Sequence, residues 1–418
     1  MKRLLKVASF TAMLTFTKMI FGFVIAKVIS IYAGPTGLAM LGQYQSFINS
    51  IIGVVSSPVK TGVVRYTAEY YKEGDFTSCL PWWRASLHWG AGVLFLIVPL
   101  IFLFSSDISF WLFGNREYYW IIGVFGIFLP LAALASLINS VLNGLQDYKR
   151  FIKLGMLSVI ISSILMIYLV YIDNVVGALV AASLQFSIMG IVLFLGVYKQ
   201  KWFTFNCWFG RTTKENYLGL GKYVFMALVG SVAAPVSIIF VRKILIENVG
   251  WEDTGHWQAV WKISEVYLSV ITVALGTYYL PKLASLNTFL EVKAEISKSV
   301  VIVLPIVTIM AIFIYVFRDF AISLLFSEQF GPARNLFLVQ LLGDIIKIVS
   351  WMYAYPMLSS GSVKWFVSTE ILFSVLLVLL TYFFVLNYGV EGANYAYCVN
   401  YIFYFLFVFS NLKSFAVK

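Results

Sequence analysis

The sequence predicts an all-α polytopic membrane protein with 12 transmembrane helices in two pseudo-symmetric six-helix bundles around a central cavity. Composition is the first reason: of 418 residues, 61% are hydrophobic and 12% charged, with a mean hydropathy of +0.89. Soluble domains carry roughly 25% charged residues, and no soluble core could bury this much apolar surface. The second reason is that the apolar residues fall in runs of about 20, the length that crosses a bilayer.

Twelve such runs follow one another along the chain. They lie near residues 7–32, 38–60, 85–104, 120–142, 154–172, 175–198, 222–246, 257–280, 298–317, 335–358, 365–386 and 391–411. Most Lys and Arg residues fall in alternate connections, a bias that places those connections in the cytoplasm. We therefore expect a multi-pass membrane protein with both termini in the cytoplasm. The same placement explains the net charge of +11 without a nucleic-acid partner.

The longest connection divides the chain into an N-terminal six-helix bundle at 1–198, a cytoplasmic or interfacial linker at 199–221 and a C-terminal six-helix bundle at 222–418. Trp202 and Trp208 in the linker suit a segment lying on the lipid headgroups. Pro235, in the middle of the seventh span, is the best candidate for a hinge because proline interrupts helical hydrogen bonding.

The two halves repeat in the same direction. VVGALVAA at the start of the sixth span matches VEGANYAY at the start of the twelfth, and LNGLQDYKRF after the fourth span matches LSSGSVKWF after the tenth. A shift of 219 residues also lays the polar stripe of span 38–60 on that of span 257–280. Parallel repeats of this kind build transporters whose substrate lies between the halves.

Charged side chains within the spans are the candidate site residues, because a charge in lipid costs several kcal/mol, on the order of 3, unless it is paired or hydrated. Lys262 and Glu265 lie three apart, as do Asp344 and Lys347, so each pair shares a helix face. Lys18 has no acidic residue near it in sequence. An excess of lysine in a cavity favours an anionic substrate.

Other basic residues allow two interpretations each. Lys27 is either a cavity cation or a side chain that reaches the outer interface. Arg242 is either an interface anchor or a substrate ligand. Lys60 and Arg65 end the second span and either line the cytoplasmic mouth of the pathway or simply follow the positive-inside rule. Glu265 is either the structural partner of Lys262 or a coupling site.

Enzymatic chemistry has little support. The sequence has three widely spaced cysteines and two histidines, no phosphate-binding GxxxxGK[ST] loop and no nucleophile–base set. We expect no catalytic residues, no metal site and no cofactor.

Several motifs resemble the Wzx family of lipid-linked oligosaccharide flippases, within the multidrug/oligosaccharidyl-lipid/polysaccharide exporter superfamily. They are GPTGLAMLGQYQSF, RYTAEYY, WQAVWKISEVYLSVITVALGTYYLPKLASL and FRDFAISLLFSEQF followed by LFLVQLLGDIIKIVSW. The resemblance covers nearly the whole chain and is closest to the branch serving O-antigen and enterobacterial common antigen.

The resemblance implies translocation of undecaprenyl-pyrophosphate-linked repeat units from the cytoplasmic to the periplasmic leaflet by alternating access. Its implied ligands for the pyrophosphate and acidic sugars are Lys18, Lys27, Lys262 and Lys347, with Arg242 as a further candidate. Glu265 and Asp344 become candidates for H⁺ or Na⁺ coupling. The implied partners are the lipid-linked glycan, membrane lipids, a polysaccharide polymerase and a chain-length regulator. The alternative is a cation-coupled multidrug exporter of the same superfamily, which would favour an acidic cavity.

Overall fold

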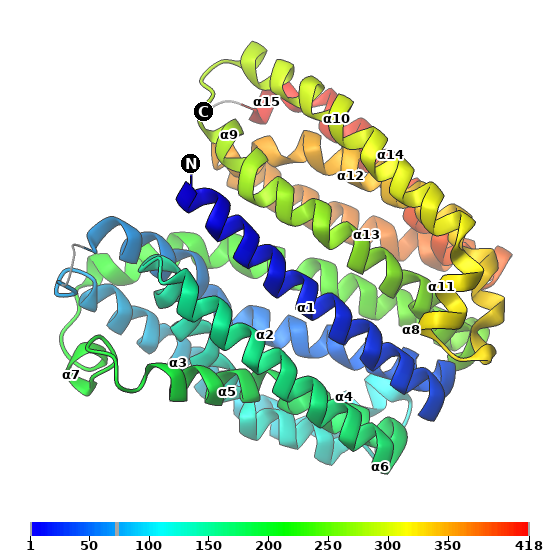
Figure 1. Ribbon diagram of the computed structural model, residues 1–418, viewed down its shortest axis with the longest axis horizontal. Coiled ribbons are helices and arrows are strands. Elements are labelled where there is room, and N and C mark those ends of the chain that lie inside the picture. Colours follow the sequence, from blue (N-terminus) through cyan, green and yellow to red (C-terminus); the bar gives the residue numbers. More distant parts are fainter. Residues whose placement is uncertain (1, 72–74, 417–418) are drawn as a thin grey trace. The chain divides into compact units, whose positions relative to one another are not determined.

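The computed structural model describes the backbone of residues 2–71 and 75–416, and the side chains of these residues other than 2–12, 58–61 and 222–226. This described part is helical and contains no β-strand, which confirms the all-α prediction. Figure 1 shows the helices in chain order. They are α1 (Lys2–Tyr32), α2 (Gly34–Tyr70), α3 (Leu80–Leu103), α4 (Ser105–Phe113), α5 (Tyr119–Gly144), α6 (Tyr148–Val197), α7 (Phe205–Trp208), α8 (Lys214–Ala274), the π-helix η1 (Leu275–Tyr279), α9 (Leu280–Ala284), α10 (Phe289–Val316), α11 (Arg318–Leu325), the 3₁₀-helix η2 (Glu328–Leu336), α12 (Phe337–Ser360), α13 (Val363–Tyr388), α14 (Glu391–Ser410) and α15 (Leu412–Phe415).

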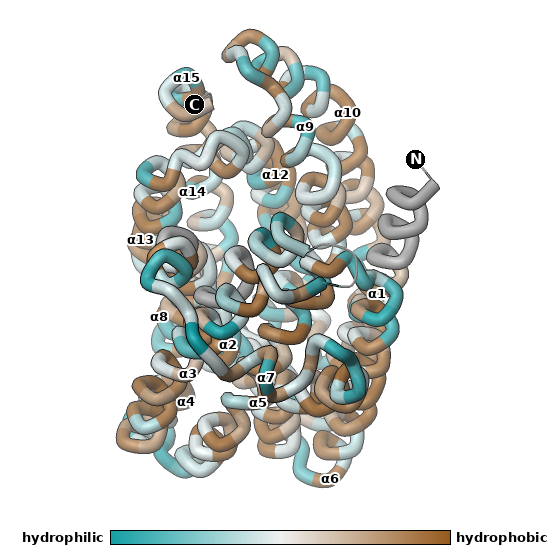
Figure 2. The backbone as a smooth tube through the Cα atoms, turned by 90° about the vertical axis from the view of Figure 1, so that its left-hand side faces the viewer, coloured by the Kyte–Doolittle hydropathy of each residue, from teal (hydrophilic) through white to brown (hydrophobic). Residues whose placement is uncertain are grey.

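Nine helices in the described part are long and apolar enough to cross a membrane. Two of these contain non-helical residues: α6 at Asp173 and Asn174, and α8 at Gly250. Each covers two of the predicted spans, and α14 covers the twelfth. The protein is thus a multi-pass membrane protein, and the count of twelve spans stays a prediction. Figure 2 shows the apolar stretches along helices such as α6 and α10.

The chain forms two compact units. Unit one comprises Met1–Tyr32 and Gln43–Pro235, and unit two comprises Ala33–Gly42 and Val236–Lys418. In unit one, α6 packs against α1 and α5, and in unit two α12 packs against α10, α13 and α14. The division into bundles at 1–198 and 222–418 was inferred from the position of the longest connection and stays a prediction. The chain passes between the units after Tyr32, after Gly42 and after Pro235, the last of which is the candidate hinge.

Unit one buries two aromatic residues of the connection before α8. Trp202 and Trp208 are 4% and 6% exposed, and both pack against Trp83, with ring centroids 6.1 and 5.5 Å away. These two side chains therefore belong to the core of unit one, where large aromatic rings bury the most apolar area. Phe205 and Phe209 of the same connection are 72% and 52% exposed, and the position of this connection on the headgroups stays a prediction.

The backbone carries the internal repeat more clearly than the sequence does. Residues with positive φ, a conformation that costs energy for most side chains, recur at a spacing of 215 or 216 positions. The pairs are Gly34 with Gly250, Gln146 with Gly361, and Asn174 with Gly389. After Gly34, α2 continues to Tyr70, whereas after Gly250, α8 ends at Ala274 and the compared stripe continues into the π-helix η1. At the start of these two helices the backbone register is therefore 216 rather than 219.

Two glycines at matching positions of the two halves show why the turns between helices are alike in both. Gly177 and Gly392 each follow a positive-φ residue by three positions, in the VVGALVAA and VEGANYAY matches. A Cβ atom on Gly177 would overlap the carbonyl oxygen of Leu169, and one on Gly392 would overlap that of Phe384. Both hairpins thus bring two helices closer than any other residue would allow.

We predict that Gly177→Ala and Gly392→Ala each destabilise the protein by about 1–3 kcal/mol, because the overlapping atoms belong to the backbone and cannot rotate away. Thermal unfolding of the purified protein in detergent measures this loss. Gly92→Ala in α3 is the matched control, since its Cβ would meet nothing within 4 Å. Equal melting temperatures for all three variants would contradict this account of the turns.

Candidate functional site

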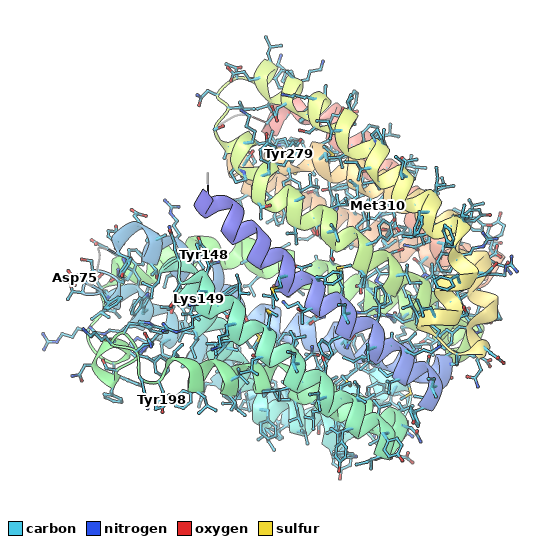
Figure 3. All side chains as sticks on the ribbon, viewed as in Figure 1. Asp75, Tyr148, Lys149, Tyr198, Tyr279 and Met310 are labelled. Carbon is cyan, nitrogen blue, oxygen red and sulfur yellow. The ribbon has the colours of Figure 1, made fainter. Side chains whose placement is uncertain are left out.

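The candidate site lies in unit two, where polar and charged side chains from α8, α12 and α14 come together. A polar group buried in such a bundle needs a partner, on its own helix or on a neighbouring one. Tyr279, labelled in Figure 3, shows the pattern near one end of the unit: it is 2% exposed and its hydroxyl donates to the carbonyl oxygen of Met352, 2.9 Å away.

Asp344 of α12 is fully buried and accepts three hydrogen bonds. The hydroxyl of Tyr267 in α8 donates to Oδ2, and the hydroxyl of Tyr397 in α14 donates to Oδ1, both at 2.8 Å. The amide nitrogen of Gln340, one turn earlier in α12, donates to Oδ1 at 3.2 Å. Donors on both oxygens stabilise a carboxylate away from water, so this cluster ties three helices of unit two together through one side chain.

Lys347, one turn after Asp344, is surrounded by aromatic rings. Its Nζ lies 4.9 Å from the ring centroid of Trp351, 5.4 Å from those of Tyr397 and Tyr401, and 5.7 Å from that of Trp261. Each distance is within the range of a cation–π interaction, which strengthens when the cation is desolvated. The ammonium group is therefore held by ring faces from α8, α12 and α14.

Asp344 and Lys347 form no direct ion pair, although both are described and share a helix face. The ion pairs found among the described residues do not include these two. The expected local pair is replaced by hydroxyl donors around the acid and rings around the base. Tyr397 serves both, since its hydroxyl bonds Asp344 while its ring faces Lys347.

Gly343 makes room for that double role. A Cβ atom at this position would lie 2.5 Å from Cδ1 of Tyr397, closer than real carbon contacts allow. The absence of a side chain lets the Tyr397 ring lie directly against α12. The LLGDIIK sequence thus contains a packing residue beside its two charges.

Arg242 of α8 is buried, with 3% of its surface exposed. Its Nε donates to Oε1 of Gln258 at 2.7 Å, and its guanidinium carbon lies 5.8 Å from the Trp257 ring centroid. Gln258 itself lies against Gly42, where a Cβ atom would fall 2.7 Å from its amide carbon. An interface anchor would be exposed to headgroups, so the burial argues against that interpretation of Arg242.

Lys262 and Glu265 form the ion pair that their spacing indicates. Nζ of Lys262 lies 3.6 Å from Oε2 of Glu265, and the side chains are 30% and 52% exposed. Glu265 also accepts a hydrogen bond of 3.1 Å from Nε1 of Trp261. A pair this open to its surroundings is worth only about 0–1 kcal/mol and can exchange its partner.

The remaining candidates lie elsewhere. Lys18 and Lys27 are both on α1 in unit one, Lys18 exposed and Lys27 half-buried. Arg65 of α2 is exposed and pairs with Glu69, 3.7 Å away. The side chain of Lys60 lies outside the described residues. Their roles as substrate-binding and cytoplasmic residues stay predictions.

Sequence reasoning missed the aromatic members of the cluster. Tyr267, Tyr397 and Tyr401 are not among the predicted site residues, yet the first two bond Asp344 and the last two face Lys347. One signal was present: Tyr397 and Tyr401 lie four apart and so share a face of α14. Their target could not be read from the sequence, because it lies on another helix.

Comparison with known proteins places the chain in a family. The family model described as "Polysaccharide biosynthesis protein" matches residues 83–335, more than half of the chain. The chain belongs to this polysaccharide biosynthesis protein family. Two proteins similar to this chain are both named "Lipid III flippase". One is from Escherichia coli (strain K12) and the other from Shigella flexneri. Each is 28% identical over 407 residues, which cover 96% of both chains.

Solved structures share the fold of this polysaccharide biosynthesis protein. An inward-facing MATE family multidrug resistance transporter of the MOP superfamily matches with a TM-score of 0.72 and 16% identity over 96% of this chain and 98% of that one. The lipid II flippase MurJ in an inward closed conformation matches with a TM-score of 0.69 and 15% identity, over 98% of this chain and 87% of the other. At these identities the likeness shows the fold alone, that of MOP-superfamily transporters.

We predict that Tyr397→Phe destabilises the protein by about 1–3 kcal/mol, because it leaves the ring over Lys347 but removes a donor from the buried Asp344 carboxylate. Thermal unfolding in detergent is the measurement. Tyr401→Phe is the matched control: its ring also faces Lys347, and no hydrogen bond joins its hydroxyl to Asp344. If the two variants lose equal stability, Asp344 does not depend on Tyr397.

Proposed function

We propose that this protein is a flippase that moves undecaprenyl-pyrophosphate-linked oligosaccharide repeat units from the cytoplasmic to the periplasmic leaflet of the bacterial inner membrane. The observation that carries the proposal is the similarity to two proteins named lipid III flippase, which extends over 96% of both chains. A match of that extent includes every helix of the candidate site. Membership of a polysaccharide biosynthesis family supports a glycan as the cargo.

The chemistry of unit two supports an anionic headgroup. A pyrophosphate that leaves water loses hydration that only cationic donors can replace, and Lys and Arg are the side chains that do so. Arg242, Lys262 and Lys347 supply three cations within one unit. Of these, Lys262 is the one held by a half-exposed carboxylate, in a contact that is open and weak. We assign it the first contact with a phosphate oxygen, which displaces Glu265.

The two acidic residues divide into different roles under this proposal. Both oxygens of Asp344 are occupied by Tyr267, Tyr397 and Gln340, so Asp344 fixes the helices. Glu265 is half-exposed and gives up its partner when a phosphate binds Lys262. A carboxylate released in this way can take up H⁺ or Na⁺, which would couple cargo binding to an ion gradient. The protein itself acts as a non-catalytic transporter, with both termini in the cytoplasm.

We predict that Lys262→Ala lowers the rate of translocation about tenfold or more, since a charge-assisted hydrogen bond contributes about 1.5–3 kcal/mol. The measurement is restoration of surface polysaccharide in a flippase-null strain, together with the amount of lipid-linked oligosaccharide left on the cytoplasmic leaflet. Lys293→Ala is the control, because Lys293 lies exposed on α10 of the same unit.

Lys18→Ala tests the contribution of α1 in the same strain. Normal polysaccharide assembly by both Lys262→Ala and Lys18→Ala would show that these lysines do not bind the cargo. A multidrug exporter would instead change drug sensitivity in the null strain and leave the lipid-linked oligosaccharide unaffected.

A further inference from the structure

A cavity of about 180 Å³ lies within unit two, and Trp351 is both one of its lining residues and one of the rings around Lys347. It is bounded by the C-terminal half of α12, the first turns of α13 and one residue of α14. Its lining is aromatic and aliphatic except for one acidic side chain, Glu370. The lining residues are Trp351, Ala354, Tyr355, Met357, Leu358, Phe366, Glu370 and Tyr404.

Glu370 is the feature of this cavity that packing does not explain. It lies on α13, a helix of 26 residues with high hydropathy that is among those able to cross the membrane. No hydrogen bond or ion pair joins Glu370 to any other residue in the described part of the chain. A carboxylate in such surroundings is costly unless a positive partner balances it.

The walls of the cavity have the chemistry of an ammonium site. Trp351, Tyr355 and Tyr404 each offer an aromatic ring, and aromatic rings around a carboxylate are the arrangement that binds alkylated ammonium groups. The protein already uses one of these rings in this way, because Trp351 lies 4.9 Å from the ammonium nitrogen of Lys347. Two further contacts hold the other rings in place: Tyr404 against Phe373 and Tyr355 against Tyr279, with centroids 4.8 and 5.7 Å apart.

We propose that this cavity binds a small organic ammonium group, with Glu370 as its counter-ion and the rings of Trp351, Tyr355 and Tyr404 around it. The volume limits the ligand, because pockets for drug-sized molecules enclose about 300–1,000 Å³. A cavity of about 180 Å³ therefore fits a headgroup or a small amine rather than a drug. Two sources share this chemistry: the ammonium of a phosphatidylethanolamine headgroup and a free amine.

The inference goes beyond the transport of a glycan, and its counter-ion, Glu370, takes no part in the candidate site, although Trp351 contacts both the cavity and Lys347. Lys262, Glu265 and Asp344 do not line the cavity. A flippase could carry this site as a place where a membrane lipid binds and holds α12, α13 and α14 together. If no ammonium group binds this cavity, the proposed cargo is unaffected. If the protein is not a flippase, the cavity can still bind an ammonium group.

The test uses the full chain in nanodiscs of phosphatidylglycerol alone, titrated with tetramethylammonium chloride by isothermal calorimetry. We expect one saturable site in the wild type. Glu370→Gln should weaken binding about tenfold or more, because it removes the counter-ion and keeps the shape of the side chain. Glu252→Gln is the matched control: it removes one negative charge from an exposed position on α8 of the same unit and should bind as the wild type does.

A second variant keeps the test decisive if Glu370→Gln folds poorly. Tyr355→Leu retains Glu370 but removes a ring, and should weaken binding several-fold. Absence of saturable binding in the wild type would overturn the proposal and indicate that Glu370 is simply protonated. Equal affinity in the wild type and both cavity variants would also overturn it, as would displacement by an equal concentration of sodium ions.

The source of the ammonium group follows from repeating the titration with phosphatidylethanolamine in the nanodiscs. If the lipid competes with tetramethylammonium in the wild type, the ligand is the lipid headgroup. If the affinity is unchanged, the site serves a free amine. Both outcomes support an ammonium site. Tetramethylammonium should bind tightly, with or without competition by the lipid, only in the wild type and in Glu252→Gln.

Discussion

The structure of unit two depends on one constraint: a charged side chain within an apolar helix must be balanced by groups that reach it from other helices. Asp344 and Lys347 meet this constraint separately, the acid through the hydroxyls of Tyr267 and Tyr397, and the base through four aromatic rings. A direct ion pair would hold only α12, since the two residues are on the same helix. The observed arrangement instead joins α8, α12 and α14.

This arrangement places strict demands on the helix that supplies the partners. Tyr397 can bond Asp344 and cover Lys347 only if α14 lies close to α12, and Gly343 provides that space. The same logic operates at the hairpins, where Gly177 and Gly392 bring neighbouring helices together. Small residues at helix contacts are the usual means of close packing in membranes. In this protein they also bring polar groups within hydrogen-bonding distance.

Much of the fold could be predicted from the sequence, because helices in lipid must satisfy their own backbone and therefore appear as long apolar runs. The order of the repeat was also readable, from VVGALVAA and VEGANYAY. Its register in the second and eighth spans was not, because a slip of three residues keeps a polar stripe on nearly the same helix face. Positive-φ residues such as Gly34 and Gly250 have no such ambiguity, since each marks a single position.

The two charge pairs show where sequence reasoning about the site stops. Lys262 with Glu265 and Asp344 with Lys347 have the same spacing, yet only the first forms an ion pair. Spacing establishes that two side chains share a face, whereas the neighbours on that face decide which contact each one makes. Glu265 is half-exposed, so its own helix supplies its partners. Asp344 is fully buried, and donors from other helices outcompete Lys347 for it because they reach its oxygens at 2.8 Å. The exchangeable pair is thus the exposed one, and this difference is the reason our proposal assigns the first contact with a phosphate to Lys262 rather than to Lys347.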